Sequence, residues 1–165
     1  MDDRRRQFEE SAQPLADGLY RAALALARND ADAQDLVQET LLKAYRGFHT
    51  YARDDNFKAW LFVILRHAWL DPCRKRKLEP ALPVDADPPA AAPAEPLDLD
   101  RALPDDLRRA FASLKPAHQV LLILCDIEGF TYREAAAVIG CPIGTVMSGL
   151  HNARKKLRAG LTGGR

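Results

Sequence analysis

A stretch rich in proline divides this chain and limits the folds that it can adopt. Residues 79–99 contain six prolines, many alanines, several acidic side chains, and no lysine or arginine. Proline removes a backbone donor, and proline-rich segments stay extended, so this stretch cannot belong to a core or a regular sheet. We predict a flexible linker over 79–99, with one module before it at 1–78 and another after it at 100–165.

Both modules are predicted to be helical throughout. In the first, apolar side chains recur at spacings of three and four along residues 15–27, 31–48 and 57–68. In the second, helices are predicted near 103–114, 117–127, 131–139 and 142–159. No stretch alternates with period two for long, as a half-buried strand would. The predicted fold class is therefore all-α, with two small helical domains joined by the acidic, Pro/Ala-rich linker.

Particular residues mark the expected helix ends. Asp30 and Asp32 stand at the start of the helix over 31–48, where an N-cap and the helix dipole favour carboxylates. Thr131 and Glu134 form a capping-box pattern, and Gly140 begins a tight turn before the last helix. The short helix, the turn and the longer helix with a basic end are the parts of a helix-turn-helix.

Composition excludes several classes of protein. A net charge of +1 excludes a uniformly basic nucleic-acid coat protein, and Cys73, Cys125 and Cys141 are too far apart for a disulfide framework or a zinc finger. We therefore expect no metal and no cofactor. No apolar run reaches about 18 residues and no signal peptide is present, so we expect a cytoplasmic protein without a membrane partner.

No catalytic constellation occurs in the sequence. It contains no phosphate-binding loop, no nucleophile elbow and no zinc-protease motif. Each of the four histidines, His49, His67, His118 and His151, is interpreted as a surface or cap residue, because they are scattered. We expect no enzyme activity.

Three patterns of charge and aromatic side chains remain. Asp35, Gln38 and Glu39 lie opposite the apolar stripe of 31–48, which is typical of a solvated face, but Leu42 beside them favours contact with a partner helix. Seven of the 12 aromatic residues fall between 45 and 69, with basic residues among and after them. Such a mixture suits stacking of unpaired bases, especially for Tyr51, Phe62 and Trp69, although packing in the core would give a similar pattern. The last helix carries polar side chains off its buried stripe and basic residues toward its end.

These segments, in this order, resemble one family. Residues 32–40 (DAQDLVQET), 56–61 (NFKAWL), Arg66, Asp71 and the basic run 74–77 resemble region 2 of the extracytoplasmic-function (ECF, group 4) sigma factors of bacterial RNA polymerase. Residues 128–136 (EGFTYREAA), 140–148 (GCPIGTVMS) and 153–157 (ARKKL) resemble region 4. The runs 144–148 and 56–60 are most similar to members governed by thiol-sensing, zinc-binding anti-sigma factors.

The resemblance implies an alternative sigma factor that binds core RNA polymerase, directs it to promoters and nucleates promoter melting. Its implied partners are the coiled coil of the largest polymerase subunit, the polymerase flap, promoter DNA as duplex and as non-template single strand, and an anti-sigma factor of the zinc-binding, redox-sensing kind. The implied polymerase-binding residues are Asp35, Gln38, Glu39 and Leu42. The residues implied for the −10 element and single-stranded DNA are Tyr51, Asn56, Phe57, Lys58, Trp60, Arg66, His67, Arg74, Lys75 and Arg76. Those implied for the −35 element, on the recognition helix, are Thr145, Met147, Ser148, Gly149, His151, Asn152, Lys155 and Lys156.

The sequence also departs from this family. Members often carry basic residues on the recognition helix where this chain has Met147, Gly149 and Asn152. Pro72 falls where the family helix continues, and we predict a kink or an early helix end near residue 71. Two alternatives stay open: a helix-turn-helix regulator that acts without polymerase, and a sigma-like adaptor or antagonist that binds protein without melting a promoter. The sequence leaves the placement of the two modules relative to each other open.

Overall fold

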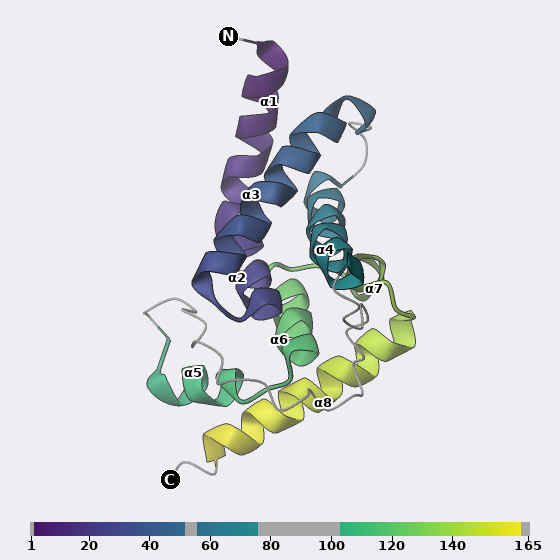
Figure 1. Ribbon diagram of the computed structural model, residues 1–165. Helices are drawn as coiled ribbons and strands as arrows, with labels where there is room; N and C mark the ends of the chain where they lie inside the picture. Colours follow the sequence, from purple (N-terminus) through teal and green to yellow (C-terminus); the bar gives the residue numbers. More distant parts are fainter. Residues whose placement is uncertain (1, 52–55, 76–102, 163–165) are drawn as a thin grey trace.

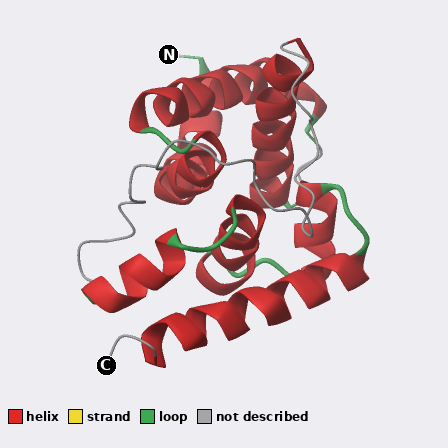
Figure 2. Cartoon of the chain, turned by 60° about the horizontal axis from the view of Figure 1, so that its bottom comes forward, coloured by secondary structure: helices red, strands yellow, loops and turns green. Residues whose placement is uncertain are grey.

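The computed structural model describes residues 2–51, 56–75 and 103–162; for residues 72–75 it describes the backbone only. These residues form helices joined by short turns, and no strand occurs among them (Figure 1, Figure 2), which confirms the all-α prediction. The first part contains α1 (Asp3–Ala12), η1 (Gln13–Leu15), α2 (Ala16–Ala27), α3 (Asp30–Gly47), η2 (Phe48–Thr50) and α4 (Phe57–Lys75). The second contains α5 (Asp105–Ala112), α6 (Pro116–Leu122), η3 (Ile123–Ile127), α7 (Tyr132–Ile139) and α8 (Ile143–Thr162). The linker predicted over 79–99 lies outside the described residues.

Helix α1 was not predicted, and it packs along α3 (Figure 1). The buried Phe8 ring makes edge contacts with the rings of Tyr45 and Phe48, each at a centroid distance of 5.4 Å. The Arg4 guanidinium donates a hydrogen bond of 2.8 Å to the Tyr45 carbonyl oxygen. One aromatic side chain and one guanidinium therefore fix a helix whose exposed residues are mostly charged and give no apolar periodicity.

The N-cap of α3 is Asn29, which corrects the expectation for Asp30 and Asp32. The Asn29 side chain accepts a hydrogen bond of 2.8 Å from the backbone N–H of Asp32, and Asn29 itself has extended backbone angles. The two aspartates occupy the first turn, where the helix dipole favours negative charge. The preceding helix, α2, ends at Arg28 in the left-handed conformation, with φ of 64°.

Helix α4 continues past Pro72 to Lys75, so the prediction of an early end near residue 71 is wrong. A proline inside a helix removes one hydrogen bond and costs about 3 kcal/mol. Here it falls in the last turn of a 19-residue helix. The burial of Leu61, Leu65 and Ala68 earlier in the helix holds it against the core and offsets that cost.

The helix predicted over 117–127 changes type midway. Its α-helical part ends at Leu122, and η3 is a π-helical turn closed by the bond from the Glu128 N–H to the Ile123 carbonyl oxygen at 2.8 Å. Gly129 follows with φ of 74°, a conformation that favours glycine. Glu128 is therefore the residue that caps η3, at the turn that precedes α7.

The predicted capping box is present. The Thr131 hydroxyl accepts from the Glu134 N–H, and the Glu134 carboxylate accepts from the Thr131 N–H. Gly140 ends α7 with φ of 77°, and α8 begins at Ile143. Val146, Leu150 and Ala153 bury one face of α8 against the rest of the second part. The helix-turn-helix expected from the sequence is thus formed.

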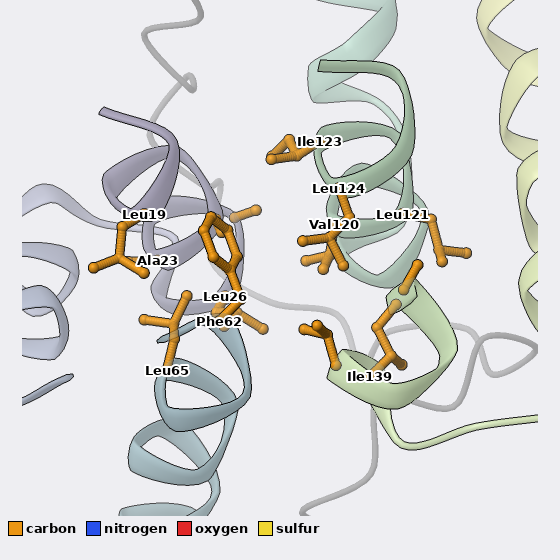
Figure 3. Close-up of a cluster of buried hydrophobic side chains, with 14 of the residues drawn as sticks. Leu19, Ala23, Leu26, Phe62, Leu65, Val120, Leu121, Ile123, Leu124 and Ile139 are labelled. Atoms are coloured by element: carbon orange, nitrogen blue, oxygen red, sulfur yellow. The ribbon is translucent and has the colours of Figure 1, made fainter. Parts of the chain in front are cut away.

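The two parts share one core. Helix α2 lies against α6, and α4 lies against α7. Figure 3 shows Phe62 of the first part on the side that faces Val120 and Leu124 of the second. The Phe62 ring is 1% exposed and meets Phe130 edge-on at 5.2 Å, so its suggested role in base stacking is wrong. His118 is also buried, at 3% exposed, which corrects its interpretation as a surface or cap residue.

Candidate nucleic-acid interface

The first candidate surface is the outer face of α3. Asp35 and Gln38 are exposed, Glu39 is half-buried, and Leu42 keeps 50% of its surface exposed. Lys43 lies 3.1 Å from Glu39 and 3.2 Å from Asp71, so two carboxylates hold this cation beside the face. The result is one exposed leucine side chain among acidic and amide groups.

The second surface carries an aromatic cluster formed by Phe8, Phe48, Tyr51, Phe57 and Trp60. Tyr51 contacts Phe57 at a centroid distance of 5.3 Å and Trp60 at 5.2 Å. Tyr51, Phe57 and Trp60 are all half-buried, so each packs in the cluster and still presents part of its ring. A cleft of about 700 Å³ is lined by Arg4 and Gln7 of α1 and by Phe48, Tyr51 and Phe57 of the cluster.

Three of the predicted −10 residues contact the second part of the chain while keeping part of their surface exposed. The Asn56 amide donates a hydrogen bond to the Glu134 carboxylate. The Lys58 ammonium lies 3.1 Å from the Glu128 carboxylate and 5.2 Å from the centre of the Phe130 ring. It also donates to the Glu128 carbonyl oxygen.

Arg66, the third of these residues, abuts the turn at Gly140. A Cβ added to Gly140 would lie 2.7 Å from the Arg66 guanidinium, so the guanidinium would have to move if this residue were not glycine. His67, in contrast, is exposed. The side chains of Arg74 and Lys75, and all of Arg76, lie outside the described residues.

Glu128 is the centre of the contact between the two parts, and sequence reasoning missed it. Its side chain is 9% exposed and lies 2.9 Å from Arg21 of α2 and 3.1 Å from Lys58 of α4. Gly18 makes room for it, because a Cβ at that position would lie 2.3 Å from a Glu128 carboxylate oxygen. Its partners are more than 60 residues away in sequence, so no local pattern could have identified it.

The third candidate surface is the outer face of α8, which runs along one edge of the molecule (Figure 1). Met147, Ser148, His151, Asn152, Lys155 and Lys156 are exposed, Thr145 is half-buried, and Gly149 is buried. Gly149 therefore belongs to the packed side of α8, and its backbone does not lie on the outer face. The other predicted residues do share the outer part of the helix.

In the described part of the chain, no group of three or more His, Cys, Asp or Glu side chains is placed to hold a metal ion. Within the same ranges, no helix combines the length and the apolar character that crossing a membrane requires. Burial and the neighbouring Asp126 carboxylate raise the pKa of the Cys125 thiol to about 11, although Arg154 acts in the opposite direction. Cys125 is thus a poor nucleophile at neutral pH.

Comparison with known proteins shows which family the chain belongs to. Residues 12–79 match Sigma-70 region 2, and residues 105–157 match Sigma-70, region 4. The ECF RNA polymerase sigma factor SigE of Mycolicibacterium smegmatis is 38% identical over 156 residues, which are 92% of this chain and 60% of that relative. The ECF RNA polymerase sigma factor EcfG of Rhodopseudomonas palustris is 37% identical over 139 residues, 83% of this chain and 75% of the relative.

A solved structure agrees with these relatives. The sigma factor RpoE from Bartonella quintana, in complex with the anti-sigma factor NepR, superposes with a TM-score of 0.70 at 33% identity, covering 96% of this chain and 99% of that one. The two matched regions define a member of the sigma-70 family, whose subunits direct RNA polymerase to promoters and are generally not enzymes. Within it, the chain belongs to the ECF RNA polymerase sigma factors.

Proposed function

We propose that this protein binds core RNA polymerase, brings it to specific promoters and nucleates melting at the −10 element. The proposal is carried by the presence of two separate outer helix faces on one chain, one on α3 in region 2 and one on α8 in region 4. The α3 face carries Asp35, Gln38 and Leu42 as exposed side chains, and the α8 face carries all the residues predicted for it except the buried Gly149. A helix-turn-helix regulator would need only the second face, and it would leave the exposed Leu42 on α3 without a role.

The α3 face is proposed as the polymerase contact. Leu42 would enter an apolar site on the coiled coil of the largest subunit, while Asp35, Gln38 and Glu39 would pair with polar groups around it. The region 4 module would meet the polymerase flap. An exposed apolar side chain bordered by polar ones is the usual anatomy of a protein interface.

Region 2 is proposed to take the non-template strand at the aromatic cluster. Tyr51, Phe57 and Trp60 present ring faces on which unpaired bases can stack, and Lys58 and Arg66 would follow the phosphates. In the closed arrangement Glu134 binds Asn56 and Glu128 binds Lys58, and the Arg66 guanidinium lies beside the turn at Gly140. Single-stranded DNA therefore requires the two modules to separate first.

Region 4 is proposed to place α8 in the major groove of the −35 element. We propose residues 1–78 and 100–165 as the two functional modules, with 79–99 as the linker that allows them to separate. The protein would act in the cytoplasm beside the polymerase and have no catalytic activity of its own. An anti-sigma factor is a further proposed partner, because the similar RpoE chain is seen with one; the zinc-binding, redox-sensing kind stays a prediction from sequence.

Run-off transcription with purified core polymerase tests this function. Core enzyme alone and core enzyme with the protein are compared on a promoter library. Specific initiation that depends on the protein supports the proposal and delivers the promoter sequence. Tight binding to core without initiation would indicate an antagonist, and binding to duplex DNA without any binding to core would indicate a helix-turn-helix regulator.

A further inference from the structure

The outer face of α8 begins with two large apolar side chains. Ile143 is 47% exposed and Met147 is 53% exposed. They are four residues apart, so they are neighbours on one face of the helix. Single exposed apolar residues are ordinary, but this pair occupies the N-terminal turns of a recognition helix, which are the turns that contact base edges in helix-turn-helix proteins.

The same turns contain no cation. Between Arg133 and Arg154 the sequence has no lysine or arginine. Arg154 is itself occupied, because two of its nitrogens lie 2.6 Å and 3.2 Å from the Asp126 carboxylate oxygens. Lys155, the first exposed cation after the turn, is 12 residues beyond Ile143, which is roughly 18 Å along a helix axis. It is placed to meet phosphates and not the bases beside Ile143.

Base chemistry connects these two facts. Guanine is recognised in the major groove chiefly by arginine or lysine, which this part of α8 lacks. Thymine alone presents a methyl group there, and apolar side chains contact it. Resting on the sigma-factor function proposed above, we propose that Ile143 and Met147 recognise the 5-methyl groups of thymines in the −35 element, so that this chain selects its promoters by apolar contact where a basic residue would select guanine.

A protein partner is the other occupant that an apolar pair could take. Duplex DNA is favoured because the pair is continuous along the helix with the polar residues Ser148 and His151 and then with Lys155 and Lys156, all exposed. In that order, the apolar and polar residues would meet base edges in the major groove, and the basic residues would meet the phosphate backbone. A protein-binding patch would have no need of the basic end.

Deoxyuridine substitution tests the inference, because it removes only the methyl group. Holoenzyme made from core polymerase and the full chain is tested on a promoter selected by that holoenzyme. Each −35 thymine, on either strand, is replaced by deoxyuridine in turn, and the −10 element is left intact. At one or two positions we expect binding to fall about fourfold, the change that corresponds to burial of one methyl-sized group.

The Met147→Ala variant makes the test specific. It should bind the thymine promoter several-fold more weakly, and its affinity should no longer change with deoxyuridine at the position that Met147 contacts. Lys155→Ala is the matched control: it should weaken binding on every sequence, reduce the salt dependence, and keep the sensitivity to deoxyuridine. Met147→Arg should shift the selected base at the same position toward guanine.

The outcomes separate the inference from the function on which it rests. Promoter-specific initiation without deoxyuridine sensitivity at any −35 position overturns the inference and leaves the sigma-factor function standing. Loss of binding to a partner protein in Met147→Ala, with DNA binding and deoxyuridine sensitivity unchanged, also overturns it and assigns the pair to that partner. Absence of initiation on every promoter overturns both.

Discussion

Neutralising Glu128 should open the protein. In Glu128→Gln the side chain keeps its size but loses the charge that holds Arg21 of α2 and Lys58 of α4. No residue proposed to contact polymerase or DNA is changed. We expect the region 4 module to separate from region 2 more often and to uncover the surface for single-stranded DNA.

The size of the effect follows from the exposure of the three side chains. Glu128 is 9% exposed, whereas Arg21 and Lys58 are 27% and 28% exposed. A hydrogen bond to a charged group contributes about 1.5–3 kcal/mol, and solvent around the two cations reduces each pair toward about 1 kcal/mol. Loss of both pairs shifts the balance by about 2 kcal/mol, which is roughly a 30-fold change in the ratio of closed to open molecules.

A second variant opens the molecule without changing its charge. Gly18→Ala places a Cβ 2.3 Å from the present position of a Glu128 carboxylate oxygen, so the carboxylate must move out of its site. Alanine is favoured over glycine inside a helix by about 1 kcal/mol, so α2 itself is not weakened. Asp17→Asn, an exposed neighbour on the same helix, is the control for removing one negative charge.

The assay is binding of a fluorescent single strand carrying the −10 sequence, together with small-angle scattering of the free proteins. Apparent affinity falls in proportion to the fraction of molecules that are competent to bind. Glu128→Gln and Gly18→Ala should both bind the strand more tightly, by up to about 30-fold for the first, and both should have a larger radius of gyration. If both behave like Asp17→Asn, then the contact around Glu128 does not hold the modules together.

Three further outcomes are expected. Replacing Asp35 and Gln38 together by alanine should weaken binding to core polymerase in a pull-down and leave the circular dichroism spectrum unchanged, because both side chains are exposed; unchanged binding would exclude the α3 face. Phe8→Ala should lower the melting temperature by several degrees, since a buried Phe→Ala change costs about 3–5 kcal/mol, and an unchanged melting point would mean that α1 is not packed. In a variant that keeps Cys125 as its only cysteine, the thiol should be alkylated at pH 8 about 100-fold more slowly in the folded than in the unfolded protein. The reason is that its pKa of about 11 in the folded protein lies above the unfolded value, so less of it is thiolate. The alkylation rate of the folded protein should therefore rise tenfold per pH unit up to about pH 11.

Local features of this fold could be predicted from the sequence. The capping box of Thr131 and Glu134 and the glycine turn at Gly140 were predicted, because each depends on residues a few positions apart. The exposure of Leu42 followed from its place off the apolar stripe. Pro72 was misjudged, because the cost of a proline depends on how much helix lies beyond it and on burial elsewhere.

Contacts between segments far apart in the chain could not be predicted from the sequence. Phe62 lies off the periodic stripe of its helix, and the structure buries it against Phe130, which the sequence places 68 positions away. The ion pairs of Glu128 with Arg21 and Lys58 depend in the same way on how the modules dock. A linker long enough to permit both a closed and an extended arrangement carries no signal for either one.

The different exposure of the α3 face and the −10 residues has a consequence for the order of assembly. Leu42 is exposed in the same molecule in which Lys58 is paired with Glu128 and Arg66 lies beside the turn at Gly140. On the assignment proposed above, the polymerase would bind first, to the closed protein, and a promoter strand would bind only after the modules separate. A copy without polymerase can, on the same assignment, present α8 to duplex DNA, but its contacts with the −10 strand stay engaged within the protein until the modules separate.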